Sequence, residues 1–197
     1  MRLQKSPERG LCIVAAFAMV FDEPADRLLT ELGNKWKTLA FEGLPVPYCW
    51  RGVHAQELIL LALKRRLAVT PIELFPQVAP PEFLRPDSHQ SYSEAVVFHG
   101  ETEDANWAIF NDVIINQRGV IKGLLAPRHI PFRRGHAVAF ERGVIFDPDG
   151  EAYQYSVAAC EQHNFYPHCA YRIDQMESPD VQSIQPDSEI CHAHVNN

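Results

Sequence analysis

The order of apolar and polar positions predicts helices mainly in the first third of the chain and strands mainly after it. An almost uninterrupted apolar run over 11–21 predicts a central, buried helix, with Cys12 in its first turn. Further helices are predicted over 24–32, 54–66 and 104–117, where apolar residues recur at helical spacing. We therefore expect three helices before the first strand.

The clearest strand pattern is a hairpin in the second half of the chain. Apolar runs over 136–140 and 144–146 are joined by Glu141-Arg142-Gly143, and the turn sequence Asp147-Pro148-Asp149-Gly150 follows. Single strands are also predicted, over 67–75, 92–99, 118–125 and 165–173.

Other segments carry turn residues or lose their apolar period. Residues 34–52 and the proline-bearing 76–87 are predicted to be irregular. The succession of helices and then strands indicates an α+β fold. We expect one domain over 1–174 and a flexible or loosely packed tail over 175–197, which is polar.

Composition and charge exclude several classes of function. With 197 residues, 46% of them hydrophobic, the chain can form a real core. Its net charge of −7 argues against binding to nucleic acids or to anionic membranes. The apolar run over 11–21 is too short to span a membrane, and Asp22-Glu23 follows it where a signal peptide would have small residues. The sequence therefore predicts a cytoplasmic protein, and its five cysteines do not form a disulfide framework.

Cys12 has the position of a catalytic thiol, at the start of the predicted central helix. The partial positive charge and free N–H groups of a helix N-terminus favour a thiolate and can bind an oxyanion. A free cysteine that only fills the core is the plainer alternative.

The predicted hairpin supplies two possible partners for this thiol. His136 lies at the start of the first strand and Asp147 at the end of the second, so the two face each other. A carboxylate in that position would orient the imidazole, and the imidazole would act as the base for a thiol. Asp149 is the alternative carboxylate, and an edge histidine with a simple turn aspartate is the structural alternative.

Four stretches in a fixed order link these residues to a known family. They are Gln4, Gly10-Leu11-Cys12 with Ala15-Ala16-Phe17-Ala18-Met19, Gly135-His136-Ala137-Val138-Ala139, and Ile145-Phe146-Asp147-Pro148. Together they resemble the papain-like cysteine peptidases, above all the bacteriocin-processing leader peptidases, which cut after a double glycine, and related bacterial hydrolases. The resemblance implies a central N-terminal helix packed on an antiparallel sheet. It also implies that Cys12 is the nucleophile, His136 the base and acid, Asp147 the orienting carboxylate and Gln4 the side-chain donor to the oxyanion.

Other residues are candidates for substrate or metal binding. Tyr48, Trp50 and His54 could line a substrate groove, although His54 and Glu57 also fit the cap of a helix. Two groups suggest zinc ligands, but their spacing fits a zinc site poorly: Cys160, His163, His168 and Cys169, and then Cys191, His192 and His194. We expect no metal and no cofactor.

The sequence thus predicts a cysteine-dependent peptidase or isopeptidase of bacterial or phage type that acts on a protein or peptide through a thioester. The alternatives are an acyltransferase with the same triad, an inactive papain-like module that binds a protein partner, and a zinc-stabilised interaction domain.

Overall fold

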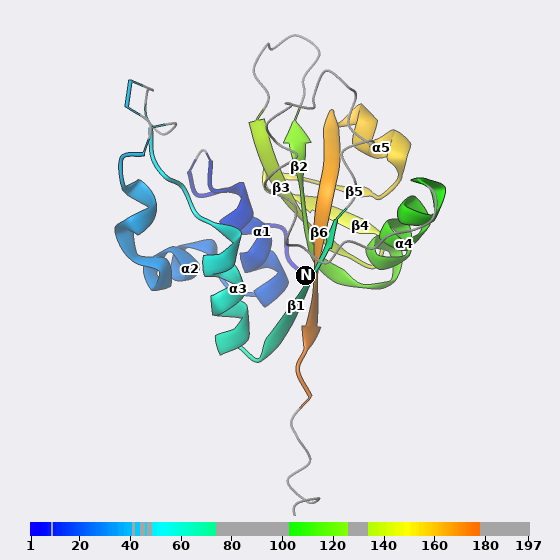
Figure 1. Ribbon diagram of the computed structural model, residues 1–197, viewed down its shortest axis with the longest axis horizontal. Helices are drawn as coiled ribbons and strands as arrows, with labels where there is room; N and C mark the ends of the chain where they lie inside the picture. The colour runs from blue at the N-terminus through cyan, green and yellow to red at the C-terminus, as the bar shows by residue number, and fades with distance from the viewer. Residues whose placement is uncertain are drawn as a thin grey trace, which may run out of the picture.

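The computed structural model describes residues 1–8, 10–40, 42–43, 46, 49–73, 103–125 and 134–177. Within them, helices pack against both faces of an antiparallel sheet, so the predicted α+β class is confirmed. Figure 1 shows α1, α2 and α3 together on one side of this sheet and α4 and α5 on the other. The elements in chain order are α1 (Cys12–Phe21), α2 (Ala25–Leu32), the 3-10 helix η1 (Gly33–Lys37), α3 (Ala55–Lys64), β1 (Leu67–Glu73), α4 (Glu103–Asn116), β2 (Arg118–Leu125), β3 (Arg134–Glu141), β4 (Val144–Asp147), β5 (Glu151–Gln154), α5 (Val157–Gln162) and β6 (Phe165–Gln175).

The strands lie in the order β1-β6-β2-β3-β4-β5. The last strand along the chain, β6, therefore lies inside the sheet between β1 and β2. The short strands β4 and β5 form one edge. The predicted hairpin is β3–β4, but its connection is one residue shorter than expected, because Glu141 pairs with Val144. Arg142 and Gly143 make the turn with φ of 48° and 79°, which suits the right-handed twist of the strands.

The sheet divides the core into two clusters, and β3 shows why. Ala137 and Ala139 face the cluster formed with α1, where small side chains let the helix approach the sheet closely. Val138 and Phe140 alternate with them and face the cluster that includes Ile114 of α4. Residues 14–20 of α1 are all buried, as the uninterrupted apolar run predicts.

Three elements were not predicted from the sequence: η1, β5 and α5. All are short, and a 3-10 helix of five residues, a strand of four and a helix of six carry too little periodicity to stand out. The predicted strand over 92–99 and the proline-bearing 76–87 lie outside the described residues, as does most of 175–197.

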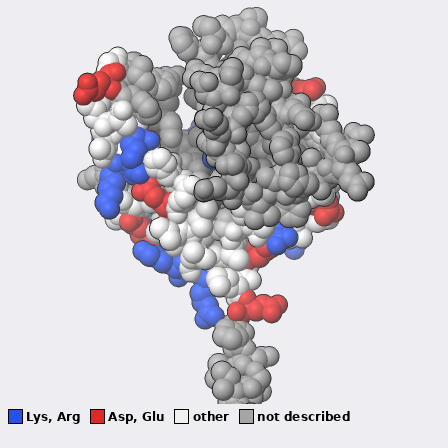
Figure 2. Space-filling view, viewed as in Figure 1, with Lys and Arg blue, Asp and Glu red and all other residues white. Residues whose placement is uncertain are grey.

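Charges on the described surface are mixed. On the face in Figure 2, acidic and basic side chains alternate rather than gather by sign. Arg65, for example, lies 2.7 Å from both Glu23 and Glu31, and so ties α3 to α2. None of the helices in the described part of the chain has the length and apolar character needed to cross a membrane.

Candidate active site

Cys12 is the first residue of α1, and it is partly exposed although the helix behind it is buried. The Leu11 carbonyl accepts the N–H groups of Val14 and Ala15 at 3.0 and 3.2 Å. The N–H groups of Cys12 and Ile13 have no acceptor among the described residues. Two donors at the positive end of a helix therefore lie beside the sulfur. The other described cysteines are all buried: Cys49, Cys160 and Cys169.

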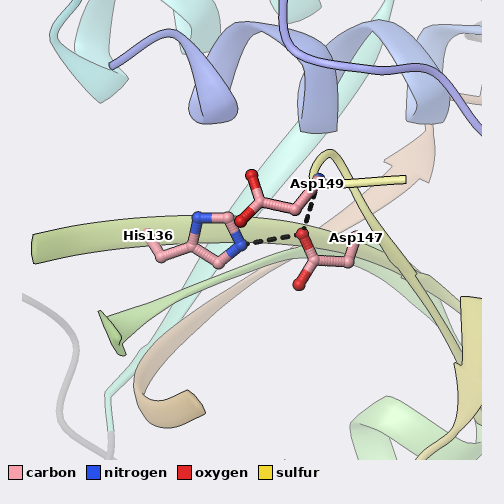
Figure 3. A group of neighbouring side chains, drawn as sticks. All are labelled: His136, Asp147 and Asp149. Atoms are coloured by element: carbon pink, nitrogen blue, oxygen red, sulfur yellow. Dashed lines mark hydrogen bonds and ion pairs between the residues drawn. The ribbon is translucent and has the colours of Figure 1, made fainter. Parts of the chain in front are cut away.

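His136 lies near the start of β3 and is 3% exposed. Its Nε2 atom lies 2.9 Å from Oδ1 of Asp147 (Figure 3). The side chain of Cys12 also interacts with His136, and this interaction raises the pKa of the ring. Because Nε2 faces Asp147, Nδ1 is the ring atom left for the thiol. In Figure 3, Nδ1 is turned away from Asp147, towards the side of the ring on which α1 lies.

An aromatic residue that the sequence did not single out also packs against the His136 ring. Phe165, the first residue of β6, packs edge-on against it with the ring centroids 5.8 Å apart. This contact depends on Gly123 of β2, which pairs with His136. A Cβ atom at Gly123 would meet the Tyr166 carbonyl and lie 2.8 Å from the Phe165 ring. The pairing of Gly123 with His136 follows from the register of the sheet, so the sequence alone carried no signal for Phe165.

Asp147 is the last residue of β4 and is 7% exposed. Its Oδ1 atom, besides facing His136, accepts the backbone N–H of Asp149 at 2.8 Å. The Gly150 N–H donates to the Asp147 carbonyl at 2.9 Å. The turn thus fixes the carboxylate against the ring. Of the two carboxylates that the sequence offers, Asp147 bonds to the ring, and Asp149 contributes a backbone donor.

The charge state of His136 follows from these contacts. Burial lowers its pKa, because the imidazolium loses solvation. The hydrogen bond to Asp147 and its charge, together with the interaction with Cys12, outweigh burial and raise the pKa of His136 from 6.5 to about 9. At neutral pH the ring is therefore an imidazolium.

Gln4 is not brought to this site. Its Nε2 donates to the Glu23 carbonyl at 2.7 Å, and its Oε1 accepts the Ala25 N–H at 3.0 Å. Both partners lie beyond the C-terminal end of α1, whereas Cys12 is at its N-terminal end. With a rise of about 1.5 Å per residue, this separates the Gln4 amide from Cys12 by about 15 Å. The oxyanion role that the resemblance implies does not fit this placement, and the donors at hand are the Cys12 and Ile13 N–H groups.

Of the three predicted substrate contacts, the structure describes Trp50 and His54. Tyr48 lies outside the described residues. Trp50 packs edge-on against Trp36, with centroids 5.3 Å apart, and Lys37 Nζ lies 4.6 Å from the Trp36 ring centroid. Trp50 and Cys12 pack against the same core cluster, so Trp50 stays on the Cys12 side of the sheet.

His54 is the N-cap residue of α3. Its backbone N–H donates to Glu57 Oε2 at 3.0 Å, and Arg51 holds the same carboxylate at 2.9 Å. This is the capping arrangement that the sequence offered as the alternative to a substrate contact.

One group of described side chains could hold a metal. His136, Asp147 and Asp149 offer ligand atoms within 4.8 Å of one another (Figure 3). The imidazole and the Asp147 carboxylate are, however, already bonded to each other, and a metal would have to break that bond. The group therefore fits an oriented base better than a resident metal ion.

The first group of suggested zinc ligands does not assemble. Cys160 and Cys169 belong to core clusters on opposite faces of the sheet. The Nδ1 atom of His163 lies 3.2 Å from Glu151. Burial raises the pKa of the Cys160 thiol to about 12, which keeps it protonated. The second suggested group lies outside the described residues: Cys191, His192 and His194.

Comparisons with known proteins assign no family to this chain. No family model matches it, and no curated protein matches it. What the chain does must therefore be inferred from the contacts among Cys12, His136 and Asp147.

Proposed function

We propose that this chain is a cysteine-dependent hydrolase with a papain-like fold, acting on a peptide or isopeptide bond of a protein or peptide substrate. Support for the fold comes from the buried helix α1, which carries Cys12 at its first residue and packs on an antiparallel sheet. Support for the chemistry comes from the roles that the contacts allow. Cys12 is the nucleophile, His136 the general acid and base, and Asp147 the residue that orients the ring.

The reaction follows from the charge state of the pair. The Cys12 thiolate attacks the substrate carbonyl carbon, and a bond forms between sulfur and carbon. The oxygen, now negative, is held by the N–H groups of Cys12 and Ile13. The His136 imidazolium gives its proton to the leaving amine as the carbon–nitrogen bond breaks, and a thioester remains. Water, deprotonated by His136, then hydrolyses the thioester and restores the thiolate–imidazolium pair.

One observation carries this proposal: a single imidazole is hydrogen-bonded to a buried carboxylate and also interacts with the side chain of a helix N-terminal cysteine. The three side chains come from α1, β3 and β4, which are far apart in sequence. A buried, ion-paired histidine with a purely structural role would need only Asp147. Contact with the partly exposed thiol of Cys12 is what a structural pair would not require.

Alkylation by iodoacetamide at pH 7, followed by peptide mass spectrometry, tests the proposal. Cys12 is more exposed than the buried cysteines, so faster labelling than theirs would not show activation. The decisive comparison is therefore Cys12 in the wild type against Cys12 in His136→Ala. We expect the rate to fall about tenfold or more in the variant, because the imidazolium that favours the thiolate is gone. Equal rates would refute the proposal.

A non-catalytic binding module of the same fold is the second candidate, and one observation favours it. Gln4 holds the end of α1 and is not available as an oxyanion donor. A site that lacks a side-chain donor has less means of stabilising the oxyanion. A module of this kind predicts no effect of His136→Ala on the alkylation of Cys12. Acyl transfer to an amine uses the same groups and differs only in the acceptor of the thioester.

A further inference from the structure

The turn that follows β4 determines where the Asp147 carboxylate lies. The turn is closed by the Gly150 N–H on the Asp147 carbonyl and by the Asp149 N–H on the Asp147 carboxylate. It connects β4 and β5, which are four residues each, and β5 is the edge strand of the sheet. A contact from another element adds to the constraint that the short ladder places on the turn.

Residues 4–8, here called the strap, make that contact. The backbone N–H of Ser6 donates to the Pro148 carbonyl at 3.0 Å, in the middle of the turn. The Lys5 side chain lies against Gly150, where an added Cβ would be 3.0 Å from Lys5 Cε. Gly150 has a φ of 111°, so the turn at this point favours a residue without a side chain. Lys5 and Ser6 therefore contact the turn directly.

The two ends of the strap are bonded to residues that flank the two ends of α1, the helix that carries the nucleophile. Gln4 bonds to Glu23 and Ala25 at the end of α1. At the other end, the Glu8 carbonyl accepts the N–H of Leu11, the residue before Cys12, at 3.2 Å. The strap thus runs along α1 from one end to the other and touches the turn in between.

We propose that the strap is a positioning element, which holds the Asp147 turn, and through it the His136 ring, in register with Cys12, and that the Ser6 N–H is its decisive contact. This inference rests on the proposed function, but the contact between the strap and the turn can be tested without measuring catalysis. It also gives Gln4 a role: Gln4 anchors the strap instead of binding the oxyanion. His136 is faced by Cys12 from α1, by Asp147 and Asp149 from the turn and by Phe165 from β6, so the turn supplies its orienting charge.

Ser6→Pro removes the N–H, whereas the matched variant Ser6→Ala keeps it and loses only the side-chain bond to the Glu8 carbonyl. The first measurement is the midpoint of the His136 titration by NMR. The second is the rate of Cys12 alkylation by iodoacetamide at pH 7. In Ser6→Pro we expect the midpoint to fall by about one pH unit and the rate by about tenfold, since one unit is a tenfold change in the equilibrium. Ser6→Ala should stay within about twofold of the wild type. Equal values for the two variants would overturn the proposal.

A second variant covers the case in which Ser6→Pro does not fold. Cys12 allows a synthetic segment of residues 1–11 to be ligated to the rest of the chain, with an ester in place of the amide at Ser6. The ester removes the N–H without adding a ring, and the all-amide ligated protein is its control. The same losses are expected, and an ester protein that matches its control would refute the role of the strap.

The two proposals fail in different ways. If Cys12 alkylates equally fast in the wild type and in His136→Ala, the proposed hydrolase function is wrong. The His136 midpoint in Ser6→Pro still decides the strap in that case, because it reports the contact with Asp147 and needs no catalysis. If Cys12 is activated but neither readout responds to the loss of the Ser6 N–H, the function stands and the strap is wrong.

Discussion

Asp147→Asn isolates the charge that orients His136. Asparagine has nearly the same shape and keeps an oxygen that can accept the Asp149 N–H, which Asp147 now accepts at 2.8 Å. What it loses is the negative charge 2.9 Å from His136 Nε2. Since Asp147 is the first of the groups that raise the pKa of His136, we expect the ring to titrate at least about one pH unit lower in the variant.

The magnitude follows from the rise in the pKa of His136 from 6.5 to about 9. Each pH unit of difference corresponds to about 1.4 kcal/mol, so the charged ring contributes about 3 kcal/mol to folding. The folded pKa lies above the unfolded one. The contribution is therefore complete below pH 6.5 and is lost as the pH rises through 9. Asp147→Asn should cost about 1–3 kcal/mol at pH 6 and much less near pH 10.

Urea unfolding at pH 6 and pH 10 measures this pH-dependent loss, and NMR titration of His136 measures its cause. Asp112→Asn is the matched control, because Asp112 is an exposed aspartate that also accepts a side-chain hydrogen bond, from Asn116 at 2.7 Å. We further expect Cys12 to alkylate about tenfold more slowly at pH 7 in Asp147→Asn, and at the wild-type rate in the control. A His136 midpoint that stays near 9 in Asp147→Asn would show that the carboxylate does not set the charge of the ring.

Four further outcomes are expected. Cys12→Ala should abolish hydrolysis and change the free energy of unfolding by less than about 1 kcal/mol, since alanine is a good helix former at a partly exposed position; turnover that survives would exclude Cys12 as the nucleophile. Gln4→Ala should lower the free energy of unfolding in urea by about 1–2 kcal/mol, because two hydrogen bonds to the backbone are lost. Its loss of turnover should be smaller than that of Cys12→Ala. An equal loss of turnover with unchanged stability would instead place Gln4 at the oxyanion site. Gly123→Ala should destabilise the protein by about 2 kcal/mol or more, seen as a lower Tm, because its Cβ would meet the Tyr166 carbonyl; an unchanged Tm would show that β6 can move away. Treatment with a chelator should leave the alkylation of Cys12 unchanged, and a rate that rises on chelation would reveal a metal at His136 and Asp149.

The elements that the sequence predicts correctly are those whose signal is local. The apolar run over 11–21 specifies a buried helix by its composition alone, and it places Cys12 at the helix start. The apolar runs over 136–140 and 144–146, with turn residues between them, specify a hairpin, because both signals act over a few residues, although the connection proved one residue shorter than predicted. The candidates Cys12, His136 and Asp147 could thus be named from the sequence, as could the cap at His54.

What the sequence could not determine depends on segments that meet only in the folded chain. The strand pairing of β3 and β4 ends at Ala139 and Phe146, so the bond between His136 and Asp147 is made beyond the ladder, by a turn that the N-terminal residues hold. No local sequence pattern predicts that Phe165 packs against the His136 ring. The family resemblance implied an oxyanion donor in Gln4, and only the path of residues 4–8 along α1 showed that its amide reaches the opposite end of the helix. The sequence by itself determined which groups are chemically capable, because side-chain chemistry and short-range periodicity are properties of the chain. The tertiary structure decided which of them meet, because the distances between them are set by packing over the whole sheet.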